Sequence, residues 1–262
     1  MGTAYKWCNT TLFVAMIVIN ALANLLPING NSTGDVSSQT PTLFTPAPYT
    51  FAIWGVIYLL MGIFILYQLR LPTESAEFVK IKNGVSIWFM VSCLMNIGWI
   101  FTWHYHRFGL SVLFIVGLLV SLIIINSGLT IDPTTGMGER TSIYGFNIYL
   151  GWICAATIAN VGVFLASINW TRFGLSEQFW TIVVLIVGTI LGIAFALNGF
   201  RYMATFAIVW AYIGIFVKHI TAKGYGNAFP LIVTVVAFAV VLMLAVVVLA
   251  SMKPEYALTK EF

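Results

Sequence analysis

The chain has 262 residues, of which 60% are apolar and only 8% are charged. A soluble domain is about half apolar and about a quarter charged, so water is excluded as the main solvent of this protein. The net charge of +4 comes from 12 basic and 8 acidic residues, and the basic residues lie singly or in pairs beside apolar segments. This distribution excludes a nucleic-acid partner and is typical of membrane topology signals.

Eight apolar segments follow one another along the chain, each near the ~20 residues that a helix needs to cross a bilayer. Inside hydrocarbon every backbone amide needs an internal partner, which favours helices over strands. Lys6 and the Ala21-Leu22-Ala23 triplet resemble a cleaved secretion signal, but apolar character continues to Ile28, so we expect the first helix to be retained. We predict an all-α transmembrane bundle of about eight helices, at residues 8–28, 50–70, 84–105, 109–129, 143–168, 176–197, 200–220 and 228–252.

The positions of the basic residues predict the orientation. With the N-terminus inside, eight lysines and arginines lie on the inner side and four on the outer side, so we expect both termini in the cytoplasm and the protein in the plasma membrane. The longest connection, at about 29–49, is rich in Asn, Ser, Thr and Pro and lacks any basic residue. A polar loop of this length on the outer side is a candidate lid.

Aromatic and amide side chains recur at helical spacing on three segments. Trp54 and Tyr58 are four residues apart, which places them on one helix face; a membrane-interface aromatic belt explains Trp54 equally well. On the third segment Asn96 lies near mid-membrane, one turn before Trp99, and interhelical hydrogen bonding is the alternative to ligand binding there. Trp152 and Asn160 share a line on the fifth segment with Tyr149 and Ala156.

A lining of aromatic and amide groups with little charge suits a flat, largely apolar ligand that accepts a few hydrogen bonds. His104 and His106 are two residues apart and point in different directions, so one metal ion is not expected to bind both, and a single histidine as a haem ligand is the alternative. Gly188 and Gly192 form a small-xxx-small pair, which is typical of close helix packing.

Three motifs resemble the TspO/MBR family, the translocator protein or tryptophan-rich sensory protein family. Residues 46–62 resemble its Pro-Pro…Val-Trp-x-x-Leu-Tyr-x-x-Met-Gly signature, and residues 95–99 resemble Leu-Asn-x-x-Trp. Residues 149–160 resemble Tyr-Leu-x-Trp…Leu-Asn. The motifs occur in family order on segments two, three and five, so the resemblance covers roughly residues 8–170. Thr45 replaces the first proline, Met95 replaces Leu, and Ala159 precedes the last Asn, departures that bear on the ligand more than on the fold.

The resemblance implies a five-helix TspO-like bundle at residues 1–170, with residues 171–262 forming three additional transmembrane helices packed on it. Family members bind porphyrins, haem and sterol-like lipids in a pocket closed by the first loop, and no cofactor is required. The extra helices offer a homodimer interface, a second pocket or a transport path. By resemblance, the ligand-binding residues are Trp54, Tyr58, Asn96, Trp99, Trp152, Asn160 and Pro46.

The leading hypothesis is therefore a ligand-binding membrane protein, a sensor or carrier for a tetrapyrrole, haem or similar apolar molecule. The alternative is a secondary transporter of an amphipathic solute, although the interior charge that ion coupling uses is nearly absent. The sequence offers no pair of nucleophile and base, so enzymatic activity is not expected. The only residues that favour an enzymatic activity are Trp54 and Trp152, because the matching tryptophans of some family members are linked to light-dependent porphyrin breakdown.

Overall fold

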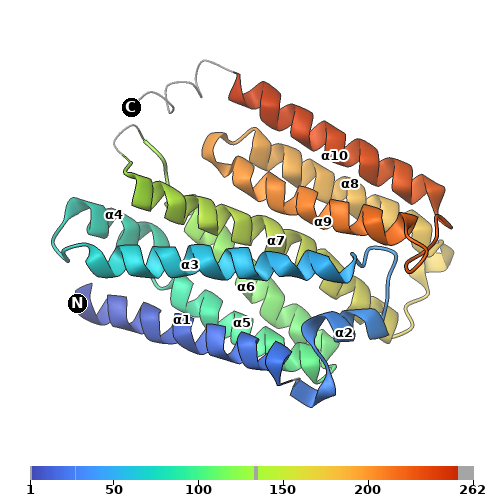
Figure 1. The fold of residues 1–262 in the computed structure, drawn as a ribbon, viewed down its shortest axis with the longest axis horizontal. Coiled ribbons are helices and arrows are strands. Elements are labelled where there is room, and N and C mark those ends of the chain that lie inside the picture. Colours follow the sequence, from blue (N-terminus) through green and yellow to red (C-terminus); the bar gives the residue numbers. More distant parts are fainter. Residues whose placement is uncertain (1, 27, 133–134, 253–262) are drawn as a thin grey trace.

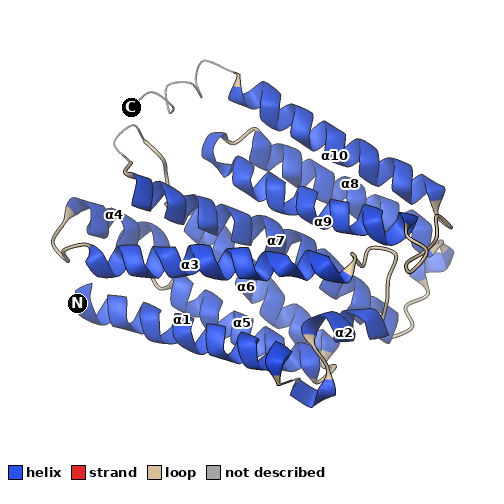
Figure 2. Cartoon of the chain, in the orientation of Figure 1, coloured by secondary structure: helices blue, strands red, loops and turns tan. Residues whose placement is uncertain are grey.

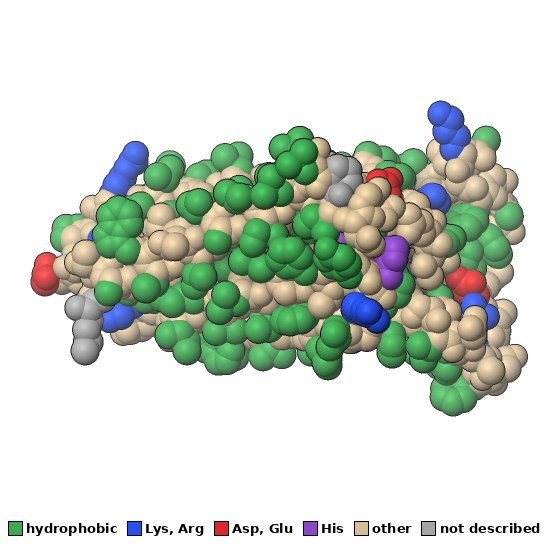
Figure 3. Space-filling view, turned by 90° about the horizontal axis from the view of Figure 1, so that it is seen from below, with side chains coloured by type: hydrophobic (Ala, Val, Ile, Leu, Met, Phe, Trp, Pro, Cys, Tyr) green, Lys and Arg blue, Asp and Glu red, His purple; other side chains and the backbone are tan. Residues whose placement is uncertain are grey.

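The computed structural model describes residues 2–26, 28–132 and 135–252, and every regular element in this part of the chain is helical (Figure 2). Among the described residues, seven helices are long and apolar enough to cross a membrane, and the bent pair α4 (Ala76–Val85) and α5 (Trp88–His104) makes an eighth span if counted as one. The all-α polytopic prediction is confirmed. Figure 3 shows hydrophobic side chains along the middle of one face and charged ones toward its two ends, as a bilayer requires.

The first five long helices form one bundle (Figure 1). α1 (Gly2–Leu25) packs on α5 and α3 (Ile53–Arg70); α6 (Phe108–Gly128) lies between α5 and α7 (Met137–Ser167). The start of α1 and the end of α10 lie at the same end of this structure. The cellular orientation and the identity of the membrane stay predictions.

The starting residues expected for two helices were wrong, and one helix was missed. The third segment, expected from residue 84, begins at Trp88, because a 43° bend separates it from α4. Ser86, in a left-handed conformation (φ 50°), lies in this bend. α7 begins at Met137 rather than 143 and runs for 31 residues. The amphipathic helix α4 was not predicted; it packs on α6 where Gly84 meets Gly128, and a Cβ on Gly84 would lie 2.7 Å from the Gly128 carbonyl oxygen.

The last three long helices pack on one another and on the first five (Figure 1). They are α8 (Glu177–Ala196), α9 (Tyr202–Ile220) and α10 (Pro230–Ser251), and α9 lies along α7. Gly151 of α7 allows this approach, because a Cβ there would overlap the Ala204 carbonyl oxygen of α9. Gly188 and Gly192 of α8 similarly make room for Tyr212 and Met243. The division into units at residues 1–170 and 171–262 stays a prediction.

The connection between α1 and α3 is folded rather than extended. It contains the short helices η1 (Ile28–Gly30), α2 (Thr33–Gln39) and η2 (Pro48–Ala52). Residues 28–52 are called the lid below, because they cover one end of the bundle (Figure 1). The remaining short elements are η3 (Arg172–Gly174) and η4 (Gly199–Arg201).

Candidate functional site

An aromatic cluster joins the three helices that carry the sequence motifs. The Trp54 ring of α3 lies 5.8 Å from the Trp99 ring of α5 and 6.2 Å from the Trp152 ring of α7, centroid to centroid. These three tryptophans come from three different helices. They meet at one point although they are separated by 45 or more positions in the sequence. Edge and tilted contacts of this kind are worth about 0.5–1.5 kcal/mol each beyond the area they bury.

These rings line a cavity beneath the lid. Its volume is about 40 Å³, which is small beside the ~300–1,000 Å³ of ordinary small-molecule sites, because the indole rings fill most of the space. The lid supplies one wall, α3 and α5 supply tryptophans, α7 supplies Trp152 with a row of small residues, and α9 supplies two apolar residues. The lining residues are Ser37, Phe44, Pro46, Phe51, Trp54, Trp99, Trp103, Trp152, Ala155, Ala156, Ala159, Asn160, Val163, Ala211 and Ile215.

Five of the seven candidate residues line this cavity, and two do not. Pro46, Trp54, Trp99, Trp152 and Asn160 contribute to its wall. Tyr58, one turn from Trp54, stacks on that ring at 5.5 Å and supports it.

Asn96 belongs to a buried hydrogen-bond network instead of the cavity wall. Asn20 of α1 donates to its Oδ1 at 2.7 Å, and its own Nδ2 donates to the Tyr149 hydroxyl at 3.1 Å. Three helices are therefore joined by amide and hydroxyl groups near mid-membrane, the structural alternative noted from the sequence. Whether Asn96 also contacts a ligand stays a prediction.

Two indole N–H groups of the cavity wall have no partner in the described part of the chain: those of Trp99 and Trp152. An indole nitrogen only donates, and an unsatisfied buried donor costs about 1–3 kcal/mol. Asn160 lies on the same wall with one side of its amide bonded to the Ser111 hydroxyl at 2.9 Å. The site therefore combines apolar aromatic faces with unused hydrogen-bonding capacity.

Several lining residues were missed by sequence reasoning. Ala155 and Ala159 leave space on α7 beside Ala156, which the sequence already placed on the Trp152 face, and their four-residue spacing is a signal that the sequence contained. Ala211 and Ile215 come from α9, more than 50 residues beyond the last motif, and nothing in their chemistry distinguishes them from other apolar residues of that helix.

The α-helix of the lid, α2, is capped at its N-terminus. The Ser32 hydroxyl accepts from the Asp35 backbone N–H at 3.2 Å, and the Ser32 backbone N–H donates to the Asp35 carboxylate at 2.9 Å, which is a capping box at the start of α2. The Ser32 hydroxyl also donates to the Asp35 carboxylate at 2.6 Å, and this hydrogen bond, followed by the one from the Ser32 N–H, lowers the pKa of Asp35. The Trp103 indole of α5 donates to the Thr33 carbonyl at 3.2 Å and so holds α2 against the bundle.

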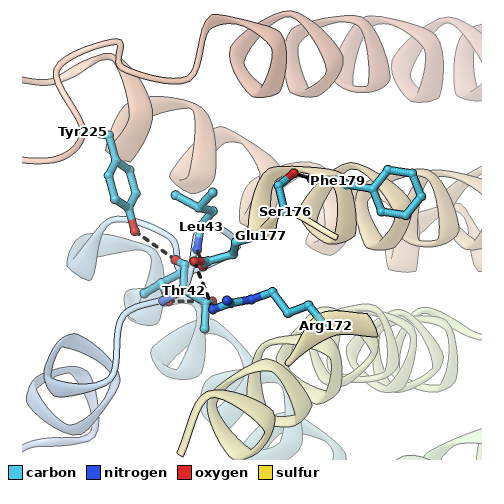
Figure 4. Close-up of polar contacts among 8 residues, drawn as sticks. Thr42, Leu43, Arg172, Ser176, Glu177, Phe179 and Tyr225 are labelled. Carbon is cyan, nitrogen blue, oxygen red and sulfur yellow. Dashed lines mark hydrogen bonds and ion pairs between the residues drawn. The ribbon is translucent and has the colours of Figure 1, made fainter. Parts of the chain in front are cut away.

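The other half of the lid is fastened by α8, α9 and the connection between α9 and α10 (Figure 4). The Glu177 carboxylate of α8 accepts from the Leu43 N–H at 2.8 Å, and the Tyr225 hydroxyl donates to the Thr42 carbonyl at 3.0 Å. His219 lies 2.8 Å from the Leu43 carbonyl through Nε2, and Trp210 donates to the Thr50 carbonyl at 2.8 Å. Residues beyond the motif-bearing part of the chain therefore hold the lid over the aromatic-lined cavity.

This arrangement defines a class: polytopic α-helical membrane proteins with an aromatic-lined cavity in the bundle, covered by a folded polar loop. Residues 6–250 match a family model described as TSPO-like protein, so the chain belongs to the TSPO-like protein family. The match extends through α8, α9 and most of α10, beyond the 8–170 covered by the motifs. Comparison with curated proteins and with solved structures gives no significant match.

Proposed function

We propose that this TSPO-like membrane protein binds a flat, largely apolar molecule of the tetrapyrrole type, such as a porphyrin or haem, and acts as its sensor or carrier. The single observation that carries the proposal is the convergence of Trp54, Trp99 and Trp152 on one lid-covered cavity. Planar aromatic walls match a planar ring system, and the surrounding apolar side chains match its low polarity.

The unpartnered indole N–H groups of Trp99 and Trp152 support the same ligand class. A tetrapyrrole carries carboxylates at its edge, and these accept hydrogen bonds. A ligand that separates the packed rings gives the two donors an acceptor and removes their desolvation cost.

Binding requires rearrangement, because the cavity of about 40 Å³ is far smaller than a porphyrin. The Trp54 ring, which contacts four other rings, has to move away from Trp99 or Trp152, and the lid has to lift to admit the ligand. Binding is therefore expected to be gated and slower than diffusion.

The test is saturable binding of protoporphyrin IX and haem to the detergent-purified protein, followed by the change in ligand absorbance. A Trp54→Ala, Trp152→Ala double variant should lose this binding while retaining its helical content and elution volume. A Trp170→Ala, Trp180→Ala variant removes two indoles outside the cavity and should bind normally.

The dimethyl ester of the same porphyrin tests the role of the donors. The ester lacks carboxylates, so it should bind more weakly than the acid to the native chain. Unchanged binding in the Trp54, Trp152 variant would place the site elsewhere, and absorbance changes that do not saturate would refute the tetrapyrrole class.

A further inference from the structure

A second and larger cavity lies between α7 and α8, beside the lid. Its volume is about 370 Å³, within the ~300–1,000 Å³ range of small-molecule sites and far above the 40 Å³ under the aromatic cluster. The two cavities share one wall residue, Phe44 of the lid. This α7–α8 cleft is lined by Thr42, Phe44, Thr157, Ile158, Val161, Gly162, Leu165, Ala166, Trp170, Arg172, Glu177, Trp180, Thr181 and Val184.

The walls of the cleft are apolar along its length. Ile158, Val161 and Leu165 of α7 face Val184 of α8 across it, and Gly162 leaves the space open. A Cβ on Gly162 would meet only the Thr42 side chain, at 3.7 Å. This long apolar slot between two membrane helices fits a hydrocarbon chain.

One end of the cleft is built by a strained turn between α7 and α8. Asn169, Arg172 and Phe173 all have positive φ values, of 53°, 57° and 55°, in the left-handed region that residues other than glycine, asparagine and aspartate rarely adopt. The Trp180 indole donates to the Arg172 carbonyl at 3.0 Å, and the Trp170 and Trp180 rings lie 5.2 Å apart. These contacts hold the turn over the cleft and place Arg172 at its mouth.

Arg172 lies opposite Glu177 at the polar end of the cleft (Figure 4). The Arg172 side chain has a single contact in the described part of the chain, a long 3.6 Å ion pair with Glu177, although a guanidinium has five N–H donors. Glu177 is itself engaged by the Leu43 N–H and lies in the first turn of α8, where the helix dipole offsets its charge. Arg172 therefore retains donors for an anion.

We infer that the α7–α8 cleft binds a single-chain amphiphile with an anionic headgroup, its hydrocarbon chain between α7 and α8 and its carboxylate or phosphate on Arg172. This site is separate from the cavity of the proposed function, and the inference does not depend on that function. Fatty acids and lysophospholipids both carry this chemistry. Since Thr42 and Phe44 line the cleft, an occupant contacts the lid directly.

The experiment uses 9,10-dibromostearic acid, whose bromine atoms quench indole fluorescence on contact, added to the delipidated full-length protein in detergent. Quenching should saturate, and it should shrink in a Trp170→Phe, Trp180→Phe variant that lacks the reporters in the cleft. Arg172→Gln should weaken binding about tenfold or more, because a charge-assisted hydrogen bond is lost. Gly162→Leu should abolish binding by filling the slot.

Matched controls separate this site from nonspecific partitioning. Arg107→Gln removes a charge at the same end of the bundle, outside the cleft, and should leave the affinity unchanged. The dibrominated methyl ester should bind about tenfold more weakly than the acid. The Trp54→Ala, Trp152→Ala variant should still bind the acid, so that failure of the tetrapyrrole site does not affect the result.

A brominated lysophosphatidate in place of the acid identifies the preferred headgroup, and tighter binding of either one supports the inference. Equal binding of the acid and the ester, or unchanged quenching in Gly162→Leu, would overturn the inference. The quenching would then come from nonspecific partitioning of the amphiphile into the detergent around the protein.

Discussion

Gly214 of α9 is the position where one methyl group should unfasten the lid. A Cβ placed there overlaps the Thr50 hydroxyl and lies 2.9 Å from the Thr50 Cγ2 and 3.0 Å from the Pro46 Cβ. The Gly214 carbonyl also accepts from the Ala47 N–H at 3.0 Å, so the lid backbone cannot shift without losing this bond. Gly214→Ala therefore pushes the lid away from α9 at its point of closest approach.

The magnitude follows from the contacts. Overpacking by one methyl costs about 1–3 kcal/mol, whereas the five hydrogen bonds that α8, α9 and Tyr225 make with residues 42–50 contribute about 0.5–1.5 kcal/mol each. The overlap thus offsets a large part of the docking free energy of the lid. A change of 1–3 kcal/mol raises the open population about 5- to 150-fold.

Hydrogen exchange read by mass spectrometry measures this opening without any ligand. Peptides covering residues 42–50 should exchange about 5- to 150-fold faster in Gly214→Ala, while peptides from α7 and α9 keep their protection. Gly55→Ala is the matched control, because a Cβ there meets nothing within 4 Å and alanine favours a helix. Native exchange rates in residues 42–50, or loss of protection across the whole bundle, would refute the reasoning.

Three further outcomes are expected. Asn96→Leu removes the buried amide that accepts from Asn20 at 2.7 Å and donates to the Tyr149 hydroxyl at 3.1 Å, so the free energy of unfolding should fall by about 1–3 kcal/mol in thermal melts, and an unchanged midpoint would contradict the network. Gly151→Ala makes a methyl overlap the Ala204 carbonyl, and separation of α7 from α9 should lower the midpoint further than Gly55→Ala does. Asp35 has a lowered pKa in the folded lid, so its stabilisation of α2 is present above the unfolded value of ~3.9 and is lost as pH falls through the folded value. A spin label on α2 should gain mobility in that acid range, and Asp35→Asn should remove the pH dependence.

The membrane class and the positions of the long helices could be predicted because they depend on local properties. Length and apolar content decide whether a segment spans a bilayer, and these are read directly from residues 108–128 or 230–251. α2 and α4 were missed because both are short, α2 being mostly polar and α4 amphipathic, and they are held by packing against their neighbours. The capping box at Ser32 and Asp35 was a readable signal for α2.

The sequence predicted which candidate residues share a face of one helix, but not which residues of different helices meet. Four- and three-residue spacing placed Trp54 beside Tyr58 and Trp99 beside Asn96, but spacing within a helix does not decide which face meets a neighbour. The structure turns Trp99 toward Trp54 and the cavity, and it places Asn96 among Asn20 and Tyr149. Both residues belong to one motif, yet they contribute to different parts of the molecule.

The sequence by itself determined that this chain is a membrane-spanning helical bundle, because the apolar content and the length of a segment are sums over neighbouring residues. Only the tertiary structure decided that α8, α9 and the connection between α9 and α10 hold the lid, and that α7 and α8 form the cleft. Those contacts join residues such as Leu43 and Glu177 that are 134 positions apart, through backbone groups that every residue carries. Local spacing has no means of encoding such a pair, since the approach is set by how the helices pack.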